Sequence, residues 1–151
     1  MRGIALFANF ASKYNSMAEY SEVEKFLNEF KQKMKIYSIV FRDERSKNNE
    51  TLFLLDIRPS DRRAVIEGLK VEDYSEGPLS DTLYNIADMW VFGKIIKSKE
   101  IYIKISMGLP NRNTICISFH IAEHPINYKF KNQWKVHLLI VKRSSTKKNV
   151  A

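Results

Sequence analysis

Apolar side chains recur at helical spacing early in the chain. Over residues 21–34 they lie three or four positions apart, the spacing of one buried helix face. Ser21 can cap this helix, and Glu24 stands three positions later, where it completes a capping box. The apolar positions on the predicted face are Val23, Phe26, Leu27, Phe30 and Met34.

Shorter patterns follow up to the middle of the chain. Residues 36–41 (IYSIVF) are β-branched or aromatic and predict a strand, whereas the charged residues 42–50 predict a loop. Pro59 suits the first position of a second helix, and Gly68 suits its end. Residues 76–78 (EGP) predict a turn. The second helix takes its apolar face from Val65, Ile66 and Leu69.

The pattern then changes from helical to alternating. Residues 89–96, 101–107 and 114–122 predict strands, and residues 135–142 are a candidate for a fourth. The short links favour antiparallel neighbours. Helices followed by a meander predict an α+β fold, in which N-terminal helices pack on one face of a mainly antiparallel β-meander.

Alternation also assigns the strand residues to faces. Isoleucine or another apolar residue occupies every second position of residues 101–107 and 114–122, and we expect these rows to lie under the helices. We expect Cys116 on the opposite, polar face, in a buried or neutral state. Four further residues share that face: Tyr102, Lys104, Ser118 and His120.

Composition and charge limit the class of protein. With 151 residues, 44% of them apolar, the chain can bury the core of one domain. One cysteine excludes an intrachain disulfide and a cysteine-rich zinc site, and no apolar run approaches ~20 residues. We therefore expect a cytoplasmic protein with no membrane partner. Residues 125–151 hold seven basic residues and no acidic one, which predicts a single α+β domain over residues 1–128 and a basic extension over residues 129–151.

The polar face carries groups that suit RNA cleavage. An antiparallel sheet often has one solvated face, and this is the simplest interpretation. However, an imidazole, a phenol and an ammonium could move protons and neutralise phosphoryl charge without a metal or cofactor. His120 and His124 have the spacing of a helical metal pair but lie on a predicted strand and its exit, so we expect no metal site. Trp90 could stack on bases, although core packing is the simpler expectation.

Short motifs across residues 66–125 resemble the MqsR branch of the RelE-like ribonuclease toxins. The similar segments are IEGLKVEDYSEGP from residue 66, MWVFGK from residue 89, EIYIKI from residue 100 and ICISFHIAEHP from residue 115. The resemblance implies a RelE-like fold and a type II toxin that cuts messenger RNA without a metal. It also implies a cognate antitoxin, often DNA-binding, as partner.

The resemblance also implies roles for individual residues. Tyr102 corresponds to the family's active-site tyrosine, and His120 stands where a family member has lysine. Ser75 and Glu76 occupy the place of a second family lysine, which is a departure from the pattern. We therefore predict a catalytic group of Tyr102, His120 and Lys104, with RNA bound by Lys94, Lys97 and His124.

A non-catalytic alternative uses the charge of the extension. A basic segment binds RNA by releasing counterions, so the chain could be an RNA- or ribosome-binding module that acts through residues 129–151. The same segment could also simply be a solvated tail.

Overall fold

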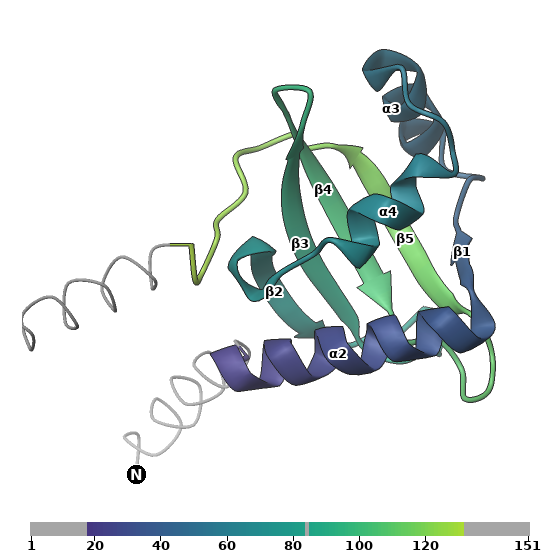
Figure 1. The fold of residues 1–151 in the computed structure, drawn as a ribbon, viewed down its shortest axis with the longest axis vertical. Coiled ribbons are helices and arrows are strands. Elements are labelled where there is room, and N and C mark those ends of the chain that lie inside the picture. Colours follow the sequence, from purple (N-terminus) through teal and green to yellow (C-terminus); the bar gives the residue numbers. More distant parts are fainter. Residues whose placement is uncertain (1–17, 84, 132–151) are drawn as a thin grey trace, which may run out of the picture.

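The computed structural model describes residues 18–83 and 85–131 of the chain. A five-stranded mixed sheet runs in the order β1-β5-β4-β3-β2. Strand β1 is parallel to β5, and all other neighbours are antiparallel. Together with the helices this is an α+β fold (Figure 1). The elements are α2 (Tyr20–Tyr37), β1 (Ile39–Phe41), α3 (Ser46–Leu55), α4 (Asp61–Glu67), a 3-10 turn (Val71–Asp73), β2 (Tyr74–Leu79), β3 (Met89–Ile96), β4 (Lys99–Ser106) and β5 (Thr114–Ile121).

Helix α2 buries the predicted apolar face. All five of its predicted core residues are buried, and Phe26 stacks on Trp90 with ring centroids 4.4 Å apart. Glu19 is the N-cap in a capping box with Glu22, so the cap predicted at Ser21 is wrong by two residues. The helix continues through Tyr37, which shortens the strand predicted over residues 36–41 to β1.

The loop predicted over residues 42–50 is wrong for its second half, because helix α3 begins at Ser46. Its buried side chains include the polar Asn48 and Thr51, while Phe53 and Leu54 are exposed. This is the reverse of an ordinary amphipathic helix, so hydrophobic periodicity does not reveal it. The helix lies beside β5, next to the part of that strand with which β1 does not pair (Figure 1).

Helix α4 and strand β2 differ from prediction at their ends. Pro59 precedes the helix, whose N-cap is Ser60, and Gly68 ends it as predicted. The turn predicted over residues 76–78 lies inside β2, an edge strand with irregular register to β3. An edge strand tolerates Pro78 because proline cannot donate a ladder hydrogen bond.

The three central strands confirm the predicted meander, but a β-bulge changes one face assignment. Lys104 is opposite Ser118, whereas Ile105 is opposite Cys116, so Ile117 is the extra residue. The side chains before the bulge are therefore reversed relative to simple alternation. Cys116 is buried as expected, but it lies in the core on the helix-covered face rather than on the polar face. Ile115 lies on the polar face instead.

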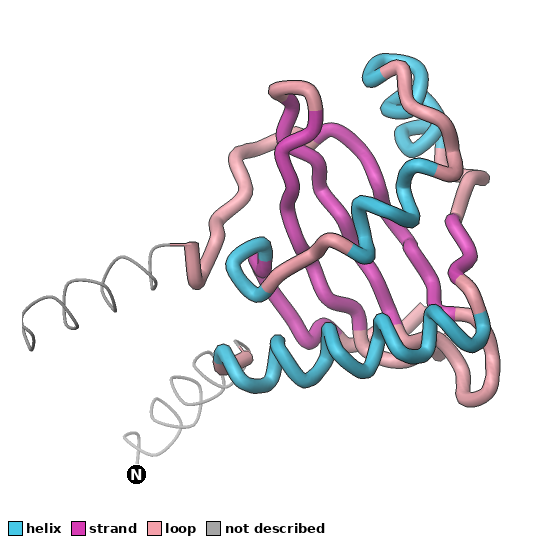
Figure 2. Tube along the Cα trace, in the orientation of Figure 1, coloured by secondary structure: helices cyan, strands magenta, loops and turns pink. Residues whose placement is uncertain are grey.

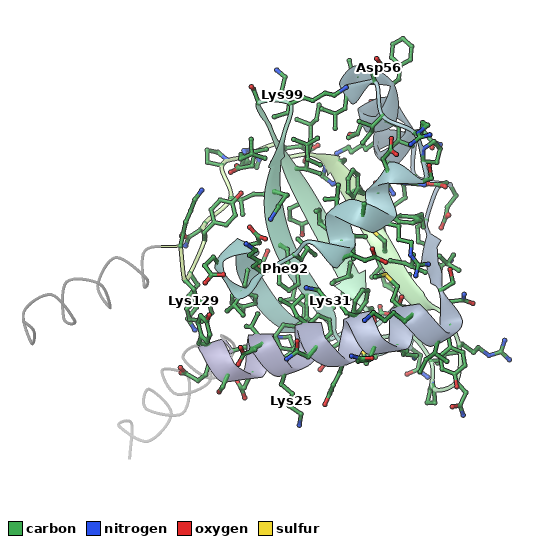
Figure 3. The ribbon with its side chains drawn as sticks, in the orientation of Figure 1. Lys25, Lys31, Asp56, Phe92, Lys99 and Lys129 are labelled. Carbon is green, nitrogen blue, oxygen red and sulfur yellow. The ribbon has the colours of Figure 1, made fainter. Side chains whose placement is uncertain are left out.

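The core fills the space between the helices and one face of the sheet. Figure 1 shows α2 running across one end of the strands and α4 crossing the same face. Phe92, labelled in Figure 3, is fully buried in this layer with Ile103 and Phe119. Trp90 also packs here, which confirms the core interpretation over base stacking.

The chain after β5 crosses back over the sheet and rejoins the core. Figure 2 shows this loop running from the end of β5 toward β3 and beyond. Phe130 is buried and stacks on Tyr74 with ring centroids 5.6 Å apart, so residue 130 packs against the core. The strand predicted over residues 135–142 and most of the basic extension lie outside the described residues. Within the described ranges, no helix is long and apolar enough to cross a membrane.

Candidate functional site

Tyr102 and His120 form a cross-strand pair on the face away from the helices. They are directly opposite each other on β4 and β5. Their rings stack with centroids 5.2 Å apart and planes inclined by 19°. Alternation predicted the shared face, and the structure confirms it.

The imidazole of His120 is oriented by its own backbone. Its Nδ1 lies 2.9 Å from the carbonyl oxygen of Ile121. A carbonyl can only accept, so Nδ1 carries the hydrogen and donates it. Nε2 is then the ring nitrogen that can gain or lose a proton.

Helix α3 holds the strand on both sides of His120. The backbone N–H of Phe119 donates to Asn48 Oδ1 at 3.0 Å, and the N–H of Ile121 donates to Thr51 Oγ1 at 3.0 Å. Strand β1 is too short to pair with this part of β5, so α3 supplies the missing partners. The two polar residues that face inward from α3 therefore position the histidine.

Tyr102 has a strongly raised pKa. Burial is the main cause, the nearby carboxylate of Glu76 adds to it, and the guanidinium of Arg45 opposes it; together they raise the pKa from 10.0 to about 12. The phenol is consequently neutral at physiological pH. It can donate a hydrogen bond there but cannot act as a base.

Two cations stand beside the pair. Lys104 Nζ lies 5.7 Å from the centroid of the Tyr102 ring. Arg45 reaches the site from the turn before α3, and its Nη1 donates to Ser118 Oγ at 3.3 Å. Arg45 lies in a segment that the sequence predicted only as a charged loop, with no pattern that linked it to β5.

These side chains line one cavity of about 730 Å³. The strands β4 and β5 form one part of its lining, and β2 with Glu76 forms another. Predicted site residues Tyr102, Lys104, His120 and His124 all contribute. The complete lining is Arg45, Ser75, Glu76, Leu79, Tyr102, Lys104, Ser118, His120, Glu123, His124, Pro125, Ile126 and Asn127.

The segment after β5 is fixed as a wall of this cavity. Glu100 accepts hydrogen bonds from the Ile126 N–H at 2.8 Å and from the Tyr128 hydroxyl at 2.9 Å. Gly93 lies beneath, where a Cβ would stand 2.5 Å from the Tyr128 oxygen. The absence of a side chain at Gly93 therefore lets this segment approach the sheet closely.

A salt bridge secures the start of the same segment. Lys47 of α3 forms an ion pair with Glu123, and this pair lowers the pKa of the carboxyl group. Two contacts therefore link the start of α3 to the cavity lining. Arg45, which precedes the helix, bonds to Ser118, and Lys47 pairs with Glu123.

Lys94 and Lys97 lie apart from the cavity. Lys94 is opposite Ile101 on the helix-covered face, and its Nζ is 2.7 Å from Asp73 Oδ2. Lys97 is in the turn after β3 and donates to the Asp56 carbonyl at 3.1 Å, at the end of the molecule where Figure 3 labels Asp56. The structure therefore does not bring these two predicted RNA-binding residues together with Tyr102.

In residues 18–83 and 85–131, no group of three or more His, Cys, Asp or Glu side chains is arranged to hold a metal ion. No protein-family model, curated protein or solved structure matches the chain.

Proposed function

We propose that the protein is a metal-independent endoribonuclease that cleaves RNA by attack of a 2′-hydroxyl on the adjacent phosphorus. The observation that carries this proposal is the stacked Tyr102–His120 pair in a cavity that also holds Lys104 and Arg45. Such a cavity offers proton transfer and positive charge at the same point, which are the two requirements of this reaction.

The proton steps need one acceptor and one donor. The 2′-oxygen loses its proton and bonds to phosphorus, the bond from phosphorus to the 5′-oxygen breaks, and that oxygen gains a proton. Glu76, on the β2 side of the cavity, would accept the first proton. His120 would deliver the second from Nε2, because its Nδ1 hydrogen is engaged by the Ile121 carbonyl.

The remaining groups would stabilise charge on the phosphoryl oxygens. Lys104 and Arg45 supply positive charge, and the neutral Tyr102 phenol donates a hydrogen bond. Donors that are already oriented toward the developing charge contribute more than flexible ones. The Arg45 side chain is oriented by its hydrogen bond to Ser118.

The resemblance of residues 66–125 to the MqsR branch of RelE-like toxins supports the same reaction. On this proposal the chain is the toxin of a type II pair, acts on messenger RNA in the cytoplasm, and is neutralised by a cognate antitoxin, of which a DNA-binding one is the expected kind. Ser75 and Glu76 stand where the family has a lysine, so the proposed role of Glu76 departs from the family pattern.

Cleavage of single-stranded RNA by purified variants tests the proposal. His120→Ala should lower the rate by about 10²–10⁴-fold, and Tyr102→Phe by about 10²-fold. Binding of an oligonucleotide blocked by 2′-O-methyl groups should persist in both variants. Tyr20→Phe is the matched control, because the Tyr20 hydroxyl bonds to Glu72, and neither residue lines the cavity.

Two results would contradict the proposal. Wild-type rates in His120→Ala would remove the proposed acid. Loss of RNA binding on deletion of residues 132–151, with no cleavage by the intact chain, would instead favour the RNA-binding module.

A further inference from the structure

A second hollow, of about 390 Å³, lies on the protein surface. Its lining combines aliphatic side chains with two arginines and contains no acidic residue. Val40 and Leu109 are 45% and 46% exposed, which is high for aliphatic side chains. The full lining is Val40, Arg42, Ile86, Leu109, Arg112, Asn113 and Ile115.

The β-bulge at Ile117 brings this hollow onto the same sheet face as the catalytic cavity. Without the bulge, Ile115 would point to the side of Phe119 and the core. With the bulge, Cys116 faces the core and Ile115 faces the side of Ser118. Ile115 precedes Ser118 by three residues on β5, a separation of about 10 Å along a strand.

The turn between β1 and α3 joins the two hollows. Arg42 lines the second hollow and Arg45 lines the catalytic cavity. The Arg45 N–H donates to the Arg42 carbonyl at 3.4 Å, and the Arg42 N–H donates to the Cys116 carbonyl at 3.0 Å. One arginine of this turn therefore lines each hollow.

The opposite wall of the second hollow is held in place. Lys33 of α2 donates to the carbonyls of Met107 and Leu109, each at 2.7 Å. The Tyr37 hydroxyl donates to Asn111 Oδ1 at 3.2 Å. The loop that carries Leu109 and Arg112 is thus fixed to α2 rather than free to close.

We propose that this second hollow binds the base of a nucleotide that flanks the cleaved one in single-stranded RNA. The proposal rests on the endoribonuclease function and names a subsite for its substrate. The aliphatic side chains would contact the face of the base, and Arg42 and Arg112 would stack on it or hold its phosphate. Two arginines and no acidic side chain line the hollow, and this net positive charge favours a polyanion over an apolar peptide. Arg42 also forms an exposed ion pair with Glu44, 3.7 Å apart, and such surface pairs are individually weak.

Abasic scanning of a bound oligonucleotide tests the subsite. The probe is a short fluorescent 2′-O-methyl oligoribonucleotide, which cannot be cleaved, with an abasic site at each position in turn. In the wild-type protein, one abasic position should weaken binding about tenfold. Leu109→Ala and Arg112→Ala should each weaken binding of the intact probe by a similar factor.

Combining the abasic probe with Leu109→Ala shows whether the missing base contacts Leu109. In Leu109→Ala, removal of the same base should cause little further loss, because the two changes delete one interaction. Leu54→Ala and Arg58→Ala are matched controls, since both residues are exposed and line neither hollow; their binding should be that of the wild type. Leu109 and Arg112 are exposed loop residues, so their variants should fold.

The outcomes separate the subsite from the catalytic proposal. Wild-type affinity in both hollow variants, an abasic penalty that persists in Leu109→Ala, or no binding of the probe would overturn the subsite, whatever His120→Ala does to cleavage. The predicted abasic pattern in a protein that does not cleave RNA would support the subsite and reject the catalysis.

Discussion

Tyr102 differs from an ordinary surface tyrosine in its surroundings. Burial and the Glu76 carboxylate both disfavour the phenolate, and Arg45 only partly offsets them. A tyrosine in this state is a lasting hydrogen-bond donor over the whole physiological pH range. Its role in the proposed reaction is therefore to stabilise charge, and the proton acceptor must be another group.

Titration of Tyr102 is the first prediction. The ultraviolet difference between wild type and Tyr102→Phe should show a phenolate that appears at about pH 12 rather than 10. Because the folded pKa is raised, the unfolded chain loses this proton first as the pH rises. The free energy of unfolding of the wild type should therefore fall progressively from about pH 10 to 12. Tyr102→Phe should not show this part of the fall. A phenolate that appears at pH 10 would show that the side chain is solvated.

Some residues of the site were accessible to sequence reasoning and others were not. Tyr102, Lys104 and His120 share a face because strands alternate, and this was predicted. Arg45 was missed, since it contacts Ser118 across 73 positions of sequence. Glu76 was noted only as a departure from a family pattern, because irregular pairing of β2 conceals which way its residues face.

At the scale of elements, β4 and β5 were the most readily predicted strands, because apolar side chains stand at every second position of residues 101–107 and 114–122. The bulge at Ile117 was not predictable, because an inserted residue leaves the composition unchanged while it reverses the faces on one side. Cys116 and Ile115 exchange their expected faces for this reason. That exchange produces the second hollow.

Helix α3 was not predicted, because its buried face includes polar side chains. It exposes Phe53 and Leu54 and buries Asn48 and Thr51, because it faces a strand edge that needs hydrogen-bond partners. Its task is to complete a sheet edge rather than to fill a core. A pattern search that looks for buried apolar side chains cannot find such a helix.

Removal of one α3 side chain should therefore be costly. Asn48→Ala leaves the buried Phe119 N–H without its acceptor, so the free energy of unfolding should fall by about 1–3 kcal/mol. The neighbouring Asn49 is exposed and bonds only to the Asp43 carbonyl at 2.8 Å, so Asn49→Ala should lower it by less than about 1 kcal/mol. Denaturant unfolding measures both. Equal effects would mean that α3 does not support the strand.

At the scale of the whole molecule, the segment after β5 joins the site to the core. It forms a wall of the cavity between Glu123 and Asn127 and then inserts Phe130 beside Tyr74. The position of the wall should therefore depend on a contact on the far side of the sheet. Alternation could not predict this segment, because it forms no strand among the described residues.

Loss of the Phe130 ring tests this arrangement. Phe130 is 2% exposed, so Phe130→Ala should lower the free energy of unfolding by about 3–5 kcal/mol. Phe53 is 86% exposed and makes the matched control, for which Phe53→Ala should change it by less than about 0.5 kcal/mol. Thermal or denaturant unfolding compares the two. A small loss in Phe130→Ala would indicate that the domain ends before this residue.

The chemical groups at the ends of the RNA fragments distinguish attack by the 2′-hydroxyl from other routes of cleavage. A single-stranded RNA is incubated with the wild-type protein in a metal chelator, and the ends of its fragments are identified. Attack by the 2′-hydroxyl should leave 2′,3′-cyclic phosphate and 5′-hydroxyl ends, with no cut at any position whose 2′-hydroxyl is replaced by hydrogen and almost no product from His120→Ala. Fragments with 3′-hydroxyl and 5′-phosphate ends, or intact RNA throughout, would contradict this mechanism.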